Sequence, residues 1–193
     1  MKTASRYHPL LVKLHWLLAV LILAAVAVGF FVLAAMPNAD PAKIAVLRRH
    51  MAGGMLILAL MIVRLVVRLV TVRPAPANRL APIVHYGFYL LVVLMVGTGF
   101  ATGLLAGLPE IVFAESGAPL PATFAVYPTF QAHFWLATLL AAFIVLHVVA
   151  ALHHQLVQRD GLLRRMGFGR RAFTSATAGD RLWRQERPRE SPP

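Results

Sequence analysis

Histidines lie inside apolar stretches of this chain, where an ionisable side chain is costly and therefore points to a function. The stretch from Gln131 to His154 is almost wholly apolar, yet it contains four histidines: His133, His147, His153 and His154. His133 and His147 are 14 positions apart. On a helix their side chains return to within about 40° of the same face, with a rise of about 21 Å. One helix would thus carry an imidazole near each surface of a membrane.

Two more histidines lie at matching depths in the other apolar stretches. His15 is in the first turns of the first stretch, and His50 is in the first turns of the second. Because successive spans alternate in direction, His50 pairs with His133 near the outer surface, and His15 pairs with His147 near the inner surface. Two imidazoles on opposite sides of an iron suit haem b, and an apolar bundle can bury the porphyrin. We therefore predict two haem b groups, with these four histidines as the iron ligands.

His154 is the alternative to His147, because it lies seven residues further along, near the same helical face. The axial distance from residue 133 to residue 154 is about 31 Å, which is the whole thickness of a hydrocarbon core of roughly 30 Å. That choice would place the inner haem among the lipid headgroups, so we prefer His147. His153 and His154 are then interface residues that can also line a quinone site. His85, at the start of the third apolar stretch, is a second candidate for that site.

Arginines flank both predicted haem positions and can pair with haem propionates. Arg48 and Arg49 are near the outer pair, and Arg64 and Arg68 are near the inner pair. The alternative for the inner two is snorkelling to the interface. Small residues, which a flat porphyrin needs beside it, are also frequent here, although glycine is common in any packed transmembrane helix. They are Gly29, Gly53, Gly54, Gly97, Gly99, Gly103 and Gly107.

The composition is that of an integral membrane protein. Of the 193 residues 59% are hydrophobic and 13% are charged, whereas a soluble domain has about 25% charged residues. The net charge of +12 would suggest nucleic acid in a soluble protein. Here Lys and Arg gather at helix ends and in the tail, as in cytoplasmic flanks that face anionic lipid. There is no cysteine, which excludes disulfides, iron–sulfur clusters and covalent haem attachment.

The apolar stretches predict an all-α, four-helix transmembrane bundle. The predicted helices span about residues 10–36, 44–70, 83–107 and 129–157, with a long loop at 108–128. The first run is longer than a signal-peptide core of about 7–15 residues, so we interpret it as a retained helix. Positive charges predict that both termini are cytoplasmic. Residues 1–160 form the predicted haem domain. Residues 161–193 form a basic tail that begins on the membrane surface and is disordered beyond about residue 175.

Short motifs around the four histidines resemble the bacterial cytochrome b561 family. They are KLHW with His15, RRHMAGG with His50, QAHFW with His133 and LHVVAALHHQL with His147. LVVRL in the second helix and GLLRRM after the fourth are also similar, so the resemblance covers about residues 5–168. It implies a multi-pass inner-membrane protein with two b haems on the matching histidines and electron exchange with ubiquinone. One type in that family oxidises superoxide at the outer face.

The resemblance leaves the electron donor open. Lys43, Arg48 and Arg49 near the outer pair can attract a small anion such as superoxide. A related family supplies the b-type membrane anchors of nickel–iron hydrogenases and formate dehydrogenases, so a redox partner protein is the first alternative. A histidine-based metal transporter is a distant alternative, because the predicted spans lack carboxylates and thiolates. A scaffold without cofactor would leave the intramembrane histidines without a physical reason.

Overall fold

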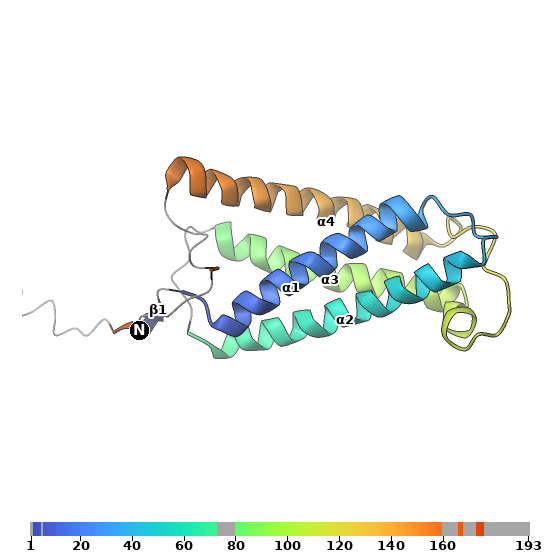
Figure 1. Ribbon diagram of the computed structural model, residues 1–193, viewed down its shortest axis with the longest axis horizontal. Helices are drawn as coiled ribbons and strands as arrows, with labels where there is room; N and C mark the ends of the chain where they lie inside the picture. The colour runs from blue at the N-terminus through green and yellow to red at the C-terminus, as the bar shows by residue number, and fades with distance from the viewer. Residues whose placement is uncertain (1, 5, 73–79, 160–165, 168–172, 176–193) are drawn as a thin grey trace, which may run out of the picture.

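The computed structural model describes residues 2–4, 6–72, 80–159, 166–167 and 173–175. It contains four long helices that run side by side along the longest axis (Figure 1): α1 (Pro9–Ala27), α2 (Ala42–Val70), α3 (Leu80–Leu105) and α4 (Pro128–His153). The four helical spans are long and apolar enough to cross a membrane. The prediction of an all-helical, four-span bundle is confirmed.

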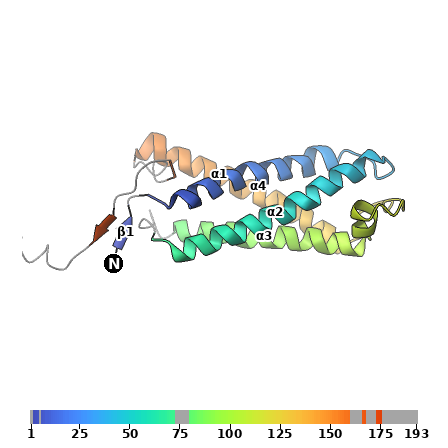
Figure 2. The same ribbon diagram turned by 60° about the horizontal axis from the view of Figure 1, so that its bottom comes forward.

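The loops after α1 and after α3 lie at one end of the bundle, and the N-terminus lies at the other (Figures 1 and 2). We call these the outer end and the inner end, following the charge pattern; which end faces the cytoplasm stays a prediction. Helix α1 packs mainly on α2, and α3 packs mainly on α4. Large apolar side chains such as Phe31 and Val70 are 79% and 77% exposed. Such surfaces suit contact with lipid tails rather than water.

Two buried clusters hold the helices together. In the middle, Leu18 of α1, Ile57 and Met61 of α2, and Val92 of α3 pack on one another. At the outer end, the loop after α3 folds back over the bundle. Four residues of this loop pack on Leu47 and Ala106 and form the second cluster with them. They are Leu108, Ile111, Val112 and Leu120. The outer end is therefore closed by a packed loop.

Helix ends differ from the predicted bounds where local chemistry sets them. The first span is α-helical only to Ala27 and continues as a π-helix, η1 (Val28–Leu33), so it ends before residue 36. Helix α2 begins two residues early, because Asp40 Oδ1 accepts the Ala42 N–H at 2.9 Å and caps the first turn. Gly107, with φ of +65°, follows the end of α3. Only glycine adopts that conformation without strain.

The observed ends of α3 and α4 also differ from the predicted ones. Helix α3 begins at Leu80, three residues before the predicted start, and ends at Leu105 rather than residue 107. Helix α4 continues as a π-helix, η3 (His154–Gln158), close to the predicted end. The loop predicted at 108–128 contains a short π-helical turn, η2 (Pro109–Phe113).

A short antiparallel pair of strands, β1 (Lys2–Ala4) with β2 (Phe173–Ser175), was not predicted. Three-residue strands carry too little sequence pattern to be recognised, and this pair joins segments far apart in the chain. The predicted surface segment at 161–173 and the disorder beyond 175 fall almost wholly outside the described residues. The boundary at residue 160 stays a prediction.

Candidate functional site: two histidine pairs

The structure brings His50 of α2 and His133 of α4 together toward the outer end. Their ring centres are 6.3 Å apart and the ring planes are at 80°. Both side chains are half-buried inside the bundle. This is the pair that the sequence predicted from the depth of each histidine in helices of alternating direction.

The ring of His133 is oriented by α3. Its Nδ1 lies 2.9 Å from the backbone carbonyl of Met95 and 3.4 Å from Thr98 Oγ1. A carbonyl only accepts hydrogen bonds, so Nδ1 carries the proton and Nε2 keeps its lone pair. This is the usual way in which a protein fixes the tautomer of a histidine that binds a metal.

Two glycines lie beside the outer imidazoles. A Cβ atom on Gly99 would lie 2.9 Å from His133 Cε1, closer than real side chains approach. A Cβ on Gly29 would lie 3.7 Å from His50 Cε1, in ordinary contact. Gly99 is thus needed for the close approach of α3 to His133. The sequence predicted small residues here without showing which glycine touches an imidazole.

His50 Nδ1 is buried and finds no hydrogen-bond partner among the described residues. An unsatisfied buried imidazole nitrogen is costly. A bound group that contacts this ring would remove that cost.

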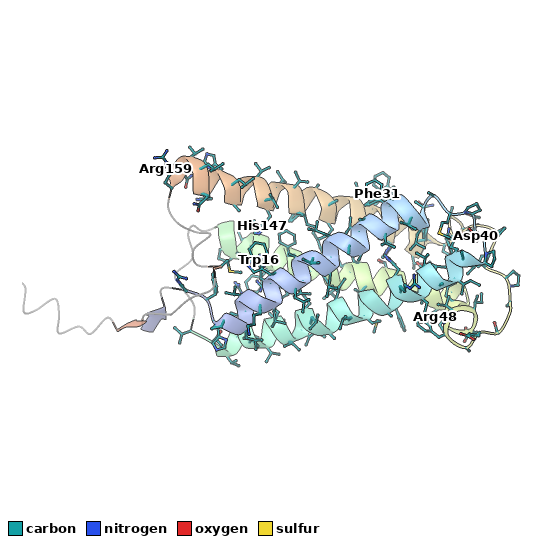
Figure 3. All side chains as sticks on the ribbon, viewed as in Figure 1. Trp16, Phe31, Asp40, Arg48, His147 and Arg159 are labelled. Carbon is teal, nitrogen blue, oxygen red and sulfur yellow. The ribbon has the colours of Figure 1, made fainter. Side chains whose placement is uncertain are left out.

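The second pair, His15 of α1 and His147 of α4, lies toward the inner end. Its ring centres are 6.4 Å apart and the planes are at 69°. Trp16 packs beside His15 with ring centres 5.3 Å apart. Figure 3 shows Trp16 and His147 close together in the view, with Asp40 and Arg48 at the far end.

A third imidazole, that of His85 on α3, reaches the inner pair. Its ring centre is 6.2 Å from that of His147, with the planes at 74°. Phe88, one turn further along α3, lies 5.4 Å from the same ring. The sequence placed His85 on the inner side but did not predict its contact with His147, because contacts between helices depend on packing.

His153 and His154 follow at the end of α4, with ring centres 6.2 Å apart. His8 accepts the N–H of Leu10 through its Nδ1 at 3.3 Å and caps α1. These histidines therefore lie outside the two interhelical pairs.

The two interhelical pairs fit the axial ligands of haem. A metal–imidazole bond is about 2 Å, and the ring centre is about 1 Å beyond the nitrogen, so two ligands across one iron have ring centres about 6 Å apart. Both pairs match this spacing. Each pair offers only two nitrogens, and a porphyrin supplies the other four. The buried, unpartnered nitrogen of His50 and the space kept by Gly99 are further features that suit a bound group.

The outer cations have partners in the protein. Arg48 donates to the Val112 carbonyl at 2.7 Å and forms an ion pair with Glu115 at 2.9 Å. Lys43 is buried, and its Nζ donates to the Met36 carbonyl at 2.6 Å. Arg49 is exposed. Arg48 and Lys43 thus tie the outer loops to α2.

The inner arginines lie one turn apart on α2. Arg64 donates to the Leu11 carbonyl of α1 at 2.8 Å. Arg68 is only 8% exposed, and its guanidinium lies over the Tyr86 ring, 5.5 Å from the centroid. Its Nε has no hydrogen-bond partner among the described residues, and neither has the hydroxyl of Tyr89. The inner end therefore holds buried donors that an anion could satisfy.

The fold and these pairs define a class: a multi-pass helical membrane protein with paired intramembrane histidines suited to haem. Comparison with known proteins agrees. The model of the prokaryotic cytochrome b561 family matches residues 6–169. Cytochrome b561 homolog 2 of Escherichia coli (strain K12) is 26% identical over 180 residues, covering 85% of this chain and 92% of that protein. The chain belongs to the prokaryotic cytochrome b561 family, which implies b-type haem and a role in electron transfer.

Proposed function

We propose that this chain is a transmembrane di-haem b cytochrome that transfers electrons between a donor at the outer end and ubiquinone at the inner end. The observation that carries the proposal is the presence of two interhelical imidazole pairs with ring centres 6.3 and 6.4 Å apart. Both pairs share α4, where their histidines differ in depth by about 21 Å. Two haems held at those depths would connect the two sides of a membrane.

The bound haems would supply the one-electron chemistry of their irons, and the protein residues would hold and tune them. His15 with His147 would hold one haem, and His50 with His133 would hold the other. The Met95 carbonyl holds the Nδ1 proton of His133 and so presents Nε2 for binding. The apolar bundle would limit the access of water to both sites.

Haem propionates are the proposed partners of Arg64 and Arg68. Arg68 is buried, and its Nε has no hydrogen-bond partner among the described residues, so that without an anion it would be an uncompensated polar group. For Arg48 the same role competes with its bonds to Glu115 and Val112. Arg49 is exposed near the outer pair and stays a candidate.

Superoxide is the proposed donor at the outer end, attracted by the local positive charge. Because Lys43 is buried and Arg48 is paired with Glu115, the exposed Arg49 is the residue whose charge is most open to an approaching anion. If Lys43, Arg48 and Arg49 were all changed to Gln and superoxide reduced the haems at the unchanged rate, the steering proposal would be wrong.

A quinone site is proposed at the inner end, next to His85 or His154. His85 is the better placed of the two for electron transfer, since its ring contacts that of the proposed ligand His147. The charge pattern supports a cytoplasmic location for this end, in a bacterial inner membrane.

The test is to purify the full chain in mild detergent and record the reduced-minus-oxidised spectrum, with a pyridine haemochrome assay for haem per chain. We expect sharp b-type α bands and about two haems per chain. A colourless protein from haem-replete cells would contradict the proposal. One haem per chain would mean that only one of the two histidine pairs binds haem.

Electron donors and acceptors are tested next on the haem-loaded protein. Superoxide generated in solution should reduce the haems, and a soluble ubiquinone analogue should reoxidise them. Reduction that requires a co-purifying dehydrogenase or hydrogenase would instead identify the chain as the membrane-anchor subunit of a larger enzyme.

A further inference from the structure

A hydroxyl group on α3 lies beside the imidazole that the Met95 carbonyl orients. Thr98 Oγ1 is 3.4 Å from His133 Nδ1, and the same Nδ1 is 2.9 Å from the Met95 carbonyl oxygen. Thr98 is half-buried and directly precedes Gly99, the residue at which α3 approaches His133 most closely. One nitrogen of the His133 ring therefore faces two oxygen atoms of α3.

The hydroxyl of Thr98 has a single proton, and a carbonyl of its own helix takes it. Thr98 Oγ1 lies 2.7 Å from the Leu94 carbonyl oxygen and 3.1 Å from that of Met95. The shorter contact is the common bond of a helical threonine to the carbonyl four residues earlier. The hydroxyl oxygen then still has a lone pair with which it can accept a hydrogen bond.

Nδ1 of His133 is the donor that faces this lone pair. It carries a proton, because the Met95 carbonyl can only accept. One N–H can be shared between two acceptors, and here the shorter bond goes to Met95 and the longer one to Thr98. The second bond is at the long end of the range, so we expect its effect to be modest.

The two imidazoles of the outer pair differ in this support. His50 Nδ1 is buried and has no hydrogen-bond partner in the part of the chain that the structure describes. A hydrogen bond from Nδ1 raises the basicity of the other ring nitrogen. His133 is therefore the stronger electron donor of the two outer imidazoles.

We propose that Thr98 is a positioning residue of the outer site: its hydroxyl is a second acceptor for the Nδ1–H of His133 and thereby lowers the reduction potential of the outer haem. The inference rests on the proposed haem sites. Each hydrogen bond from Nδ1 leaves more electron density on Nε2, and a stronger donor stabilises the oxidised iron. A lower potential at the outer haem favours electron transfer toward the inner haem, which is the direction of the proposed function.

The experiment is a redox titration of both haems in the full chain and its variants. Thr98→Val removes the hydroxyl and keeps the branched shape, whereas Thr98→Ser keeps the hydroxyl. Thr102→Val is the matched control one turn further along α3, because the Thr102 hydroxyl lies 2.9 Å from the Thr98 carbonyl oxygen and 2.9 Å from the Thr129 hydroxyl. The redox wave that is lost or shifts most in His133→Ala identifies the outer haem.

We expect Thr98→Val to raise the potential of the outer haem by about 28 mV, which is a threefold change in the equilibrium at about 59 mV per tenfold. Thr98→Ser and Thr102→Val should keep the wild-type potential, and the inner haem should be unchanged in every variant. Haem per chain should stay at about two, because none of these changes removes a proposed iron ligand. Thr98→Ala, which also lacks the hydroxyl, covers the case in which the valine variant does not fold.

An unchanged outer potential in Thr98→Val would overturn the inference. A lowered potential would also overturn it, because the hydroxyl would then act by competing for the Met95 carbonyl. An equal shift in Thr102→Val would show that the packing of α3, rather than the Thr98 hydroxyl, sets the potential. In these three cases the di-haem proposal stands, whereas a wild-type protein without haem would overturn the di-haem proposal itself.

Discussion

The outer and the inner histidine pairs have almost the same ring separation, yet different groups hold them. At the outer pair, the backbone sets the position of an imidazole: the Met95 carbonyl bonds His133, and Gly99 gives it room. At the inner pair, aromatic and imidazole rings surround His147, namely those of His85 and Phe88. A backbone carbonyl on a helix has little freedom to move, whereas a side chain can change rotamer. The same ligand spacing can thus be built rigidly at one end and adaptably at the other.

The outer and inner ends of the bundle also differ in whether a loop closes them and in their charged side chains. A packed loop closes the outer end, and Arg48 ties it to α2 through Val112 and Glu115. The inner end instead has the buried Arg68, whose Nε has no hydrogen-bond partner in the part of the chain that the structure describes. A closed outer end suits a small molecule as the proposed donor, and the buried Arg68 suits an anionic group held within the protein.

The largest effect on haem content is expected when a proposed ligand of the outer haem is removed. His133→Ala takes away the imidazole that the Met95 carbonyl orients, so the haem content should fall from about two to about one per chain. The pyridine haemochrome assay measures this directly. Retention of both haems in a six-coordinate, low-spin form would mean that the outer site has another ligand, and the contrast between the ends would be lost.

The next largest effect is expected from Gly99→Ala. Its Cβ would lie 2.9 Å from His133 Cε1 and 3.1 Å from Nδ1. Because the Met95 bond fixes that ring, overpacking should cost about 1–3 kcal/mol and lower retention of the outer haem alone. Gly97→Ala is the control, since a Cβ there meets no atom within 4 Å. Thermal unfolding and haem content should separate the two variants; equal behaviour would show that the close approach is relieved at no cost.

Arg68→Gln tests the charge at the inner end. A cation near a haem favours the reduced form, which carries one more electron, so its loss should lower the reduction potential of the inner haem. A tenfold change in a one-electron equilibrium is about 59 mV, and a shift of tens of millivolts is expected. Lys13→Gln, an exposed charge on α1, is the control and should change the potential less. Redox titration of both haems measures the shift, and an equal shift at the outer haem would contradict a local effect.

The smallest effect is expected from Glu115→Gln. The ion pair with Arg48 is exposed, with side-chain exposures of 41% for Arg48 and 72% for Glu115. Exposed ion pairs contribute about 0–1 kcal/mol, and Arg48 keeps its bond to the Val112 carbonyl. We expect a small fall in melting temperature that disappears at high salt, with haem content unchanged. Glu110→Gln, also exposed, serves as the control, and loss of the outer haem in Glu115→Gln would show that the ion pair does more than hold the loop.

The sequence predicted the bundle well because apolar length is a strong signal. Four spans follow directly from runs of about 20 or more apolar residues. Helix ends were less predictable, since they depend on single residues: the Asp40 cap moved the start of α2, and η1 changed the geometry at the end of the first span. The strand pair β1–β2 left no usable pattern in the sequence.

The sequence by itself determined which histidines lie at which depth, because helical rise converts residue number into position along the membrane normal. Depth alone placed His15 with His147 and His50 with His133. Only the tertiary structure decided what lies beside each ring: the Met95 carbonyl and Gly99 at the outer pair, and His85 and Phe88 at the inner pair. The physical reason is that rise along a helix is fixed by local geometry. Rotation and contact between helices are set by side-chain packing along the whole interface.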